Sequence, residues 1–200
     1  MRAGVVTAVA AVALTAAGCS LISPVAAPVV PTFPATTTTA APASSGAKPV
    51  LPANCKDLID GQQLDKALGL PLSAVVKTVV GQPSPSVGQT GRVSCSYGIP
   101  SAAHTYALEL SLTSYRDPSA AAARVPVNVD ALRTPGVEPL PIPIGGMTGM
   151  YLALRDGPML IASSGIYSVT VTLGPTSFSP KAAIGSAAAV AGMVLTNVRA

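Results

Sequence analysis

The sequence predicts an α+β domain with a six-stranded, mainly antiparallel sheet, packed helices and one disulfide. Strand patterns and helix signals follow one another in the order helix, three strands, helix, three strands, helix. The links inside each group of strands are too short for the crossovers that parallel pairing needs, and this favours antiparallel neighbours. Helices that cover such a sheet complete an α+β layer structure.

Cap residues mark the helices. For the first helix, Asp60 is a suitable N-cap, Gln63 stands three residues later, and Gly69 is a stop signal. Two further helices begin at aspartate-proline and serine-proline pairs, because proline fits the first helical position. We expect the second helix to end at Pro126 and the third to run to about Leu195; their start pairs are Asp117-Pro118 and Ser179-Pro180.

Alternating apolar residues and turn signals mark the strands. The clearest hairpin signal is Asp156-Gly157 between two apolar runs, and Ser164-Gly165 turns the chain again. The stretch 134–146 contains four prolines and is expected to form an irregular connection. The expected strands are 75–80, 92–99, 106–112, 150–154, 159–162 and 167–173.

The first residues have the order of a secretory signal peptide. Arg2 supplies a positive charge, Val5–Leu14 is an apolar run, and small residues follow up to Gly18. The run is short for a membrane span, which needs about 20 apolar residues. We therefore expect 1–18 to be a signal peptide, with an uncleaved membrane anchor as an alternative.

The end of this segment, Ala16-Ala17-Gly18-Cys19, resembles the lipobox of bacterial lipoproteins. The resemblance implies that the Cys19 sulfur receives a diacylglyceryl group and that cleavage makes Cys19 the first residue. A further acyl chain such as palmitate then holds the protein on the extracytoplasmic face of the cell membrane, because two chains anchor stably. The sequence departs from the usual motif at Ala16, where leucine or valine is usual. A secreted protein with an incidental Cys19 is the other alternative.

Composition separates a tether from a domain. Residues 19–48 contain five prolines and a threonine run, show no helix or strand period, and are expected to form an extended tether. Residues 49–200 are expected to form one globular domain. Two of the three cysteines, Cys55 and Cys95, fall in this domain. In an oxidising compartment such a remaining pair favours a disulfide over a metal or redox pair.

Charge and histidine content argue against several functions. The net charge is +4, but the twelve lysines and arginines are scattered, so no nucleic-acid-binding patch is expected. His104 is the only histidine, the acids are dispersed, and no metal-ligand cluster or phosphate-binding loop is present. We expect no cofactor and no enzymatic activity, with a hydrolase using His104 as the least favoured alternative.

Three methionines and a tyrosine mark a candidate apolar ligand site, formed by Met147, Met150, Tyr151 and Met159. Methionine side chains adapt to irregular apolar ligands, so a groove for a lipid or another apolar molecule is one interpretation of these residues. The preferred interpretation is that they fill a core poor in aromatic side chains, since the chain has no tryptophan.

The domain resembles a group of uncharacterised actinobacterial lipoproteins. The resemblance rests on Cys55 before the first helix, Leu68-Gly69 at its end and Cys95-Ser96-Tyr97 on a later strand, with Tyr97 where tryptophan is more usual. In fold alone, the layout is also similar to extracellular ligand-sensing domains of the same bacteria. These resemblances imply a lipid-anchored envelope lipoprotein that binds a protein partner or an apolar ligand without catalysis. A structural envelope component without a ligand is the alternative.

Overall fold

The computed structural model describes residues 51–72, 77–98 and 106–199. The helices are α1 Gly61–Leu68, α2 Pro118–Leu132 and α3 Pro180–Asn197, and short 3-10 turns lie at Cys55–Asp57 and Pro85–Val87. The strands are β1 Lys77–Gly81, β2 Gln89–Tyr97, β3 Leu108–Tyr115, β4 Leu140–Ile144, β5 Met147–Leu152, β6 Met159–Ser164 and β7 Tyr167–Leu173.

All of these strands belong to one antiparallel sheet, in the order β1-β2-β3-β7-β6-β5-β4. The predicted α+β class and antiparallel pairing are therefore confirmed, whereas the expected number of six strands is wrong because the described residues form seven. The two groups of strands meet where β3 pairs with β7. The centre of the sheet thus joins residues that are far apart in the sequence.

The additional strand is β4, in the proline-rich stretch that was expected to be irregular. Proline cannot donate a ladder hydrogen bond, so a sheet accepts it at an edge strand. β4 is such an edge, and Pro141 and Pro143 alternate there with Ile142 and Ile144. The prolines are exposed, whereas Ile144 is buried in the core. The free energy gained by burying Ile144 outweighs the cost of the two missing proline N–H donors.

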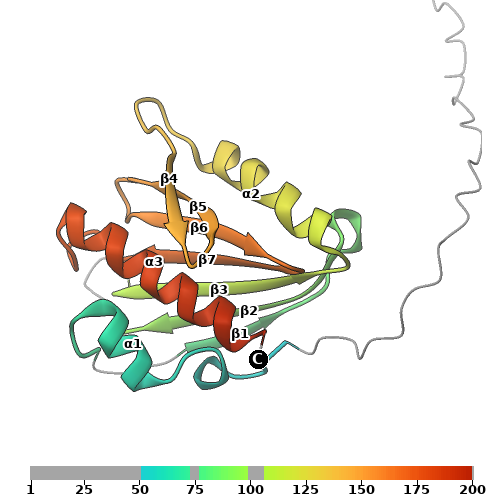
Figure 1. Cartoon of the computed structure of the whole chain (residues 1–200), viewed down its shortest axis with the longest axis horizontal. Helices are drawn as coiled ribbons and strands as arrows, with labels where there is room; N and C mark the ends of the chain where they lie inside the picture. Colours follow the sequence, from blue (N-terminus) through green and yellow to red (C-terminus); the bar gives the residue numbers. More distant parts are fainter. Residues whose placement is uncertain (1–50, 73–76, 99–105, 200) are drawn as a thin grey trace, which may run out of the picture. The chain divides into compact units, whose positions relative to one another are not determined.

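The main core lies between one face of the sheet and helices α1 and α3 (Figure 1). Alternate residues of the central strands are completely buried there, because successive side chains of a strand point to opposite faces. Helix α3 adds small side chains that let it lie close to the sheet. The largest contributions from β3, β7 and α3 are Leu108, Leu110, Leu112, Val169, Val171, Val190 and Val194.

Helix α2 lies on the opposite side of the sheet (Figure 1), where Val129 contacts a smaller cluster with Leu152 and Ile161. This helix continues to Leu132, so the expectation that Pro126 ends it is wrong. Pro126 removes one helical hydrogen bond, but the exposed carbonyl that loses its donor can be solvated by water. The burial of Val129 stabilises the turns that follow.

The local signals around the first helix are confirmed. Asp60 accepts a hydrogen bond from the Gln63 backbone at 2.8 Å, and the Gln63 side chain accepts one from the Asp60 backbone at 3.3 Å. Gly69 ends the helix with a φ of 69°, a left-handed conformation that favours glycine. The predicted disulfide joins Cys55 to Cys95 and fixes the segment before α1 to β2. Among the described residues, no helix is long and apolar enough to span a membrane.

Candidate ligand-binding trough

Polar side chains cover part of the sheet face on which α2 lies. Because the apolar residues of β2, β3 and β7 point into the main core, the alternate residues face this side. Pairing aligns them in rows: Ser94 lies opposite Ser111, and Ser111 lies opposite Thr170. The hydroxyl groups of neighbouring strands therefore form a continuous polar floor.

This floor and one side of α2 line an open cavity of about 400 Å³, which we call the trough. Its size falls within the range of about 300–1,000 Å³ that is usual for small-molecule sites. The side chains that line it are Gln89, Arg92, Ser94, Ser96, Glu109, Ser111, Thr113, Tyr115, Arg124, Asn128, Met159, Thr170 and Thr172.

Two arginines lie at one end of the trough. Arg92 comes from β2 and donates hydrogen bonds to Ser111 at 2.8 Å and to Ser94 at 3.2 Å. Arg124 comes from α2 and donates to Asn128 at 3.2 Å. The ion pairs found in the described part of the chain are Arg116–Asp117 and Arg133–Glu138, and neither uses a trough arginine.

Tyr115 lines the trough together with the two arginines. Burial raises the pKa of its hydroxyl, and the positive charges of Arg124 and Arg92 oppose that rise. A carboxylate or phosphate placed here would meet two cations and one hydroxyl donor, and arginine binds such oxyanions in bidentate geometry.

Glu109 gives the opposite end of the trough a negative charge. It pairs with Ser96 on β2 and Thr172 on β7, four positions along β3 from Thr113, which pairs with Arg92. At about 3.3 Å per residue, this separates the two ends by ~13 Å. Glu109 is exposed. The trough is therefore cationic at one end, hydroxyl-lined in the middle and anionic at the other.

A second cavity, of about 480 Å³, lies beside the disulfide and is mostly apolar. Ile59, Leu64 and Leu72 line it, together with Tyr97 of β2. Among the described residues, the buried Tyr97 hydroxyl has no hydrogen-bond partner, and burial raises its pKa to about 12. Burial of this hydroxyl lowers the stability of the folded protein. The cavity is also a second candidate site for a ligand.

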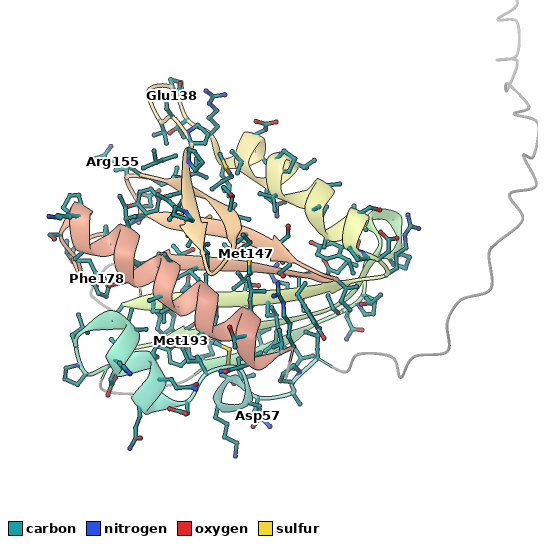
Figure 2. All side chains as sticks on the ribbon, in the orientation of Figure 1. Asp57, Glu138, Met147, Arg155, Phe178 and Met193 are labelled. Carbon is teal, nitrogen blue, oxygen red and sulfur yellow. A yellow bond between two sulfur atoms is a disulfide. The ribbon has the colours of Figure 1, made fainter. Side chains whose placement is uncertain are left out.

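The structure does not bring the four predicted apolar-site residues together on one surface. Met147 and Tyr151 lie with the main core that α3 covers, and Figure 2 shows Met147 close to that helix. Met150 and Met159 belong to the smaller cluster under α2. The two pairs face opposite sides of the sheet because Met150 and Tyr151 are successive residues of β5.

Two other residues singled out in the sequence, Cys19 and His104, lie outside the described residues. Within the described ranges, no group of three or more histidine, cysteine, aspartate or glutamate side chains is placed to hold a metal ion.

Comparison with known proteins adds one point about the fold. No family model matches the chain, and no curated protein matches it. Among solved structures, it is similar to the extracellular domain of PknH from Mycobacterium tuberculosis. The match covers 77% of this chain and 99% of that chain, at 12% sequence identity and a TM-score of 0.50. At this identity the similarity shows a shared α+β fold.

Sequence reasoning missed the trough. Arg92 and Arg124 are isolated charges in the sequence, and only the packing of α2 on the sheet brings them together. The available signal was the second face of the predicted strands, where serine and threonine alternate with apolar residues. A polar face on several neighbouring central strands indicates a hydrated surface or a site rather than a core.

Proposed function

We propose that the protein is a non-enzymatic binding domain, anchored through lipidated Cys19 on the extracytoplasmic face of the membrane. In this proposal its trough binds a small anionic ligand that carries several hydroxyl groups, such as a sugar acid or a sugar phosphate. The observation that carries the proposal is that Arg92, Arg124 and Tyr115 line one cavity whose floor consists of hydroxyl groups.

The chemistry of the trough favours this ligand class over an apolar one. Its serine and threonine hydroxyls donate and accept hydrogen bonds, as do the hydroxyl groups of a sugar. The arginines supply donors and positive charge without an acceptor, so they select an anion. Glu109 at the far end accepts hydrogen bonds from ligand hydroxyls. A neutral, apolar molecule would leave these polar groups unpaired.

Three observations support the location. The lipobox-like Ala16-Ala17-Gly18-Cys19 follows an apolar segment of signal-peptide length. The similar solved structure is itself described as an extracellular domain. The Cys55–Cys95 disulfide also fits an oxidising compartment. A binding domain held outside the membrane agrees with all three.

Ligand binding can be tested by calorimetric titration of the full chain in detergent with glucuronate, glucose 6-phosphate and glucose. We expect the two anions to bind and glucose to bind at least tenfold more weakly. Arg92→Ala and Arg124→Ala should each weaken anion binding about tenfold or more, the range for a lost charge-assisted hydrogen bond. Arg155→Ala is the matched control, since Arg155 is exposed in the turn between β5 and β6 (Figure 2). Equal binding of glucose, or an equal loss in the control, would overturn the proposal.

The anchor has a separate test in Cys19→Ala. We expect the native chain to partition into the detergent phase of a Triton X-114 extract and the variant to move to the aqueous phase, because the acyl chains are lost. Mass spectrometry of the native chain should show the added diacylglyceryl group. If the variant stays in the detergent phase, the apolar run Val5–Leu14 is the anchor instead.

A further inference from the structure

The two edges of the sheet differ in a way that bears on association. At the β4 edge, Pro141 and Pro143 lack N–H groups and cannot template another strand. At the β1 edge, Lys77–Gly81 contains no proline, and its register with β2 runs unbroken over five pairs. One edge is thus closed to further pairing, whereas no strand of the described residues pairs with the outer side of the other.

The backbone groups that face outward from β1 follow from its pairing with β2. Tyr115 of β3 donates to Ile166 at 2.8 Å, so the odd-numbered residues of β3 bond to β7 and the even-numbered ones bond to β2. Hydrogen-bonded and non-hydrogen-bonded pairs alternate along an antiparallel ladder. In the registers of β3 with β2 and of β2 with β1, this alternation makes Lys77, Val79 and Gly81 hydrogen-bonded to β2. The N–H and C=O groups of Thr78 and Val80 therefore point to the outer edge.

The side chains of β1 also favour pairing. Val79 is 49% exposed and Val80 is 62% exposed, the two highest values among the large apolar residues described. They lie on opposite faces of the strand, so a neighbouring strand would shield both. Lys77 is the only charged residue of β1.

We propose that β1 pairs antiparallel with β1 of a second copy of this chain, about a two-fold axis at Val79. Thr78 then exchanges both hydrogen bonds with Val80 of the partner subunit, and Val79 lies opposite Val79 of the partner subunit in a non-hydrogen-bonded pair. The outward groups match without a shift of register. Each lysine faces a glycine, whereas parallel pairing would set the two lysines side by side, and adjacent like charges destabilise a sheet. The edge is therefore complementary to itself.

The contact is small. A five-residue strand pair buries less than the ~1,000 Å² that a stable interface requires. We therefore expect a weak, concentration-dependent dimer, which a shared membrane would favour by raising the local concentration of anchored copies. This inference does not depend on the ligand of the trough.

Cysteine cross-linking tests the register, with Val79→Cys and Val80→Cys compared in a full chain that carries Cys19→Ala in both cases. At the two-fold axis, residue 79 lies about 4.5 Å from its copy between α-carbons, within the disulfide range of about 4.4–6.8 Å. Residue 80 lies opposite Thr78 of the partner subunit and not opposite itself. We expect mild oxidation to give at least tenfold more covalent dimer with Val79→Cys, although Val80 is the more exposed. Mass spectrometry of the intact Cys55–Cys95 bridge confirms that both variants fold.

Equal cross-linking of the two variants, or more with Val80→Cys, would indicate random collisions and overturn the proposal. Sedimentation of the native full chain in detergent gives a second measurement. We expect a monomer–dimer equilibrium that Val79→Lys shifts toward monomer, because it sets two lysines opposite each other, and that Val80→Lys changes less. A native chain that stays monomeric at every concentration would also overturn it. A β1 edge that instead binds only a different protein would appear as a monomer here.

Discussion

The side chain of Asn197, at the end of α3, donates a hydrogen bond at 2.8 Å to the backbone carbonyl of Leu58, 139 residues earlier. The same amide group also donates to the Gln63 side chain at 3.1 Å. Leu58 is completely buried, so its carbonyl depends on this contact rather than on bulk water. One amide thus links the last helix to the segment before the first.

We predict that Asn197→Ala lowers the free energy of unfolding by about 1–2 kcal/mol, because a buried acceptor loses its donor. Chemical denaturation with urea measures the change. Asn197→Asp is the matched second variant. It keeps the shape of the side chain but replaces the donating amide group with an oxygen, which would face the Leu58 carbonyl and the Gln63 side-chain oxygen. The aspartate variant should be at least as unstable as the alanine variant. A fully stable aspartate variant would show that packing, not donation, matters at this position.

Helix α2 offers a prediction in the opposite direction. Pro126 is exposed inside the helix and removes one backbone hydrogen bond. We predict that Pro126→Ala raises the free energy of unfolding by about 1–3 kcal/mol, since interior proline costs about 3 kcal/mol relative to alanine. Thermal unfolding followed by circular dichroism detects it as a higher Tm. A lower Tm would mean that the proline bend is needed to seat Val129 against the sheet.

The disulfide closes a loop with a sequence separation of 40 residues. In the chain-entropy model such a loop stabilises the folded state by about 4 kcal/mol. We predict a loss of this size in the double variant Cys55→Ala/Cys95→Ala, measured by urea unfolding. A reducing agent should destabilise the native chain similarly and leave the double variant unchanged. If reduction destabilises both equally, its effect does not come from this bridge.

Tyr97 makes stability depend on alkaline pH. Its pKa rises from 10.0 to about 12 in the folded protein, because burial disfavours the phenolate. The unfolded chain therefore ionises first as the pH increases. The stabilising contribution is fully present below pH 10 and is lost as the pH rises from about 10 to about 12. Each pKa unit corresponds to about 1.4 kcal/mol, so the loss is about 3 kcal/mol.

Tyr97→Phe separates this effect from that of the other tyrosines. We predict that the variant loses less stability than the native chain between pH 10 and 12. At neutral pH it should be about 1 kcal/mol more stable, since the buried Tyr97 hydroxyl finds no partner in the part of the chain that the structure describes. Urea unfolding at pH 7 and pH 11 measures both changes. A variant that is less stable at pH 7 would show that the hydroxyl has a bound water or other partner in solution.

The sequence predicted the features that depend on neighbouring residues. The capping box at Asp60 and Gln63 and the stop at Gly69 are local, and the structure confirms them. The Cys55–Cys95 pairing followed from a count of cysteines and the expected compartment. Errors arose where tertiary packing overrides a local rule. Buried Ile144 makes β4 a strand despite its prolines, and buried Val129 carries α2 past Pro126.

The candidate site was not predictable from local patterns. Arg92 and Arg124 line the same trough only because α2 lies on the face of the sheet from which the Arg92 side chain projects. The strand order that builds this face depends on the pairing of β3 with β7, which are far apart in the sequence. Methionine content pointed instead to Met147 and Met150, which the alternation of side chains sends to opposite faces. Composition alone did not distinguish core from surface here.

The strand order also determines the order in which the strands can pair when the chain is synthesised or exported with its N-terminal end first. Residues up to Tyr115 complete β1, β2, β3 and both bridged cysteines, so this half can pair and oxidise early. The outer edge of β3 then has no neighbour until β7 arrives, near Leu173. Closing this long loop is the entropically costly step. During that interval the unfinished edge of β3, rather than any edge of the native sheet, is the surface most prone to misassembly and most in need of a chaperone.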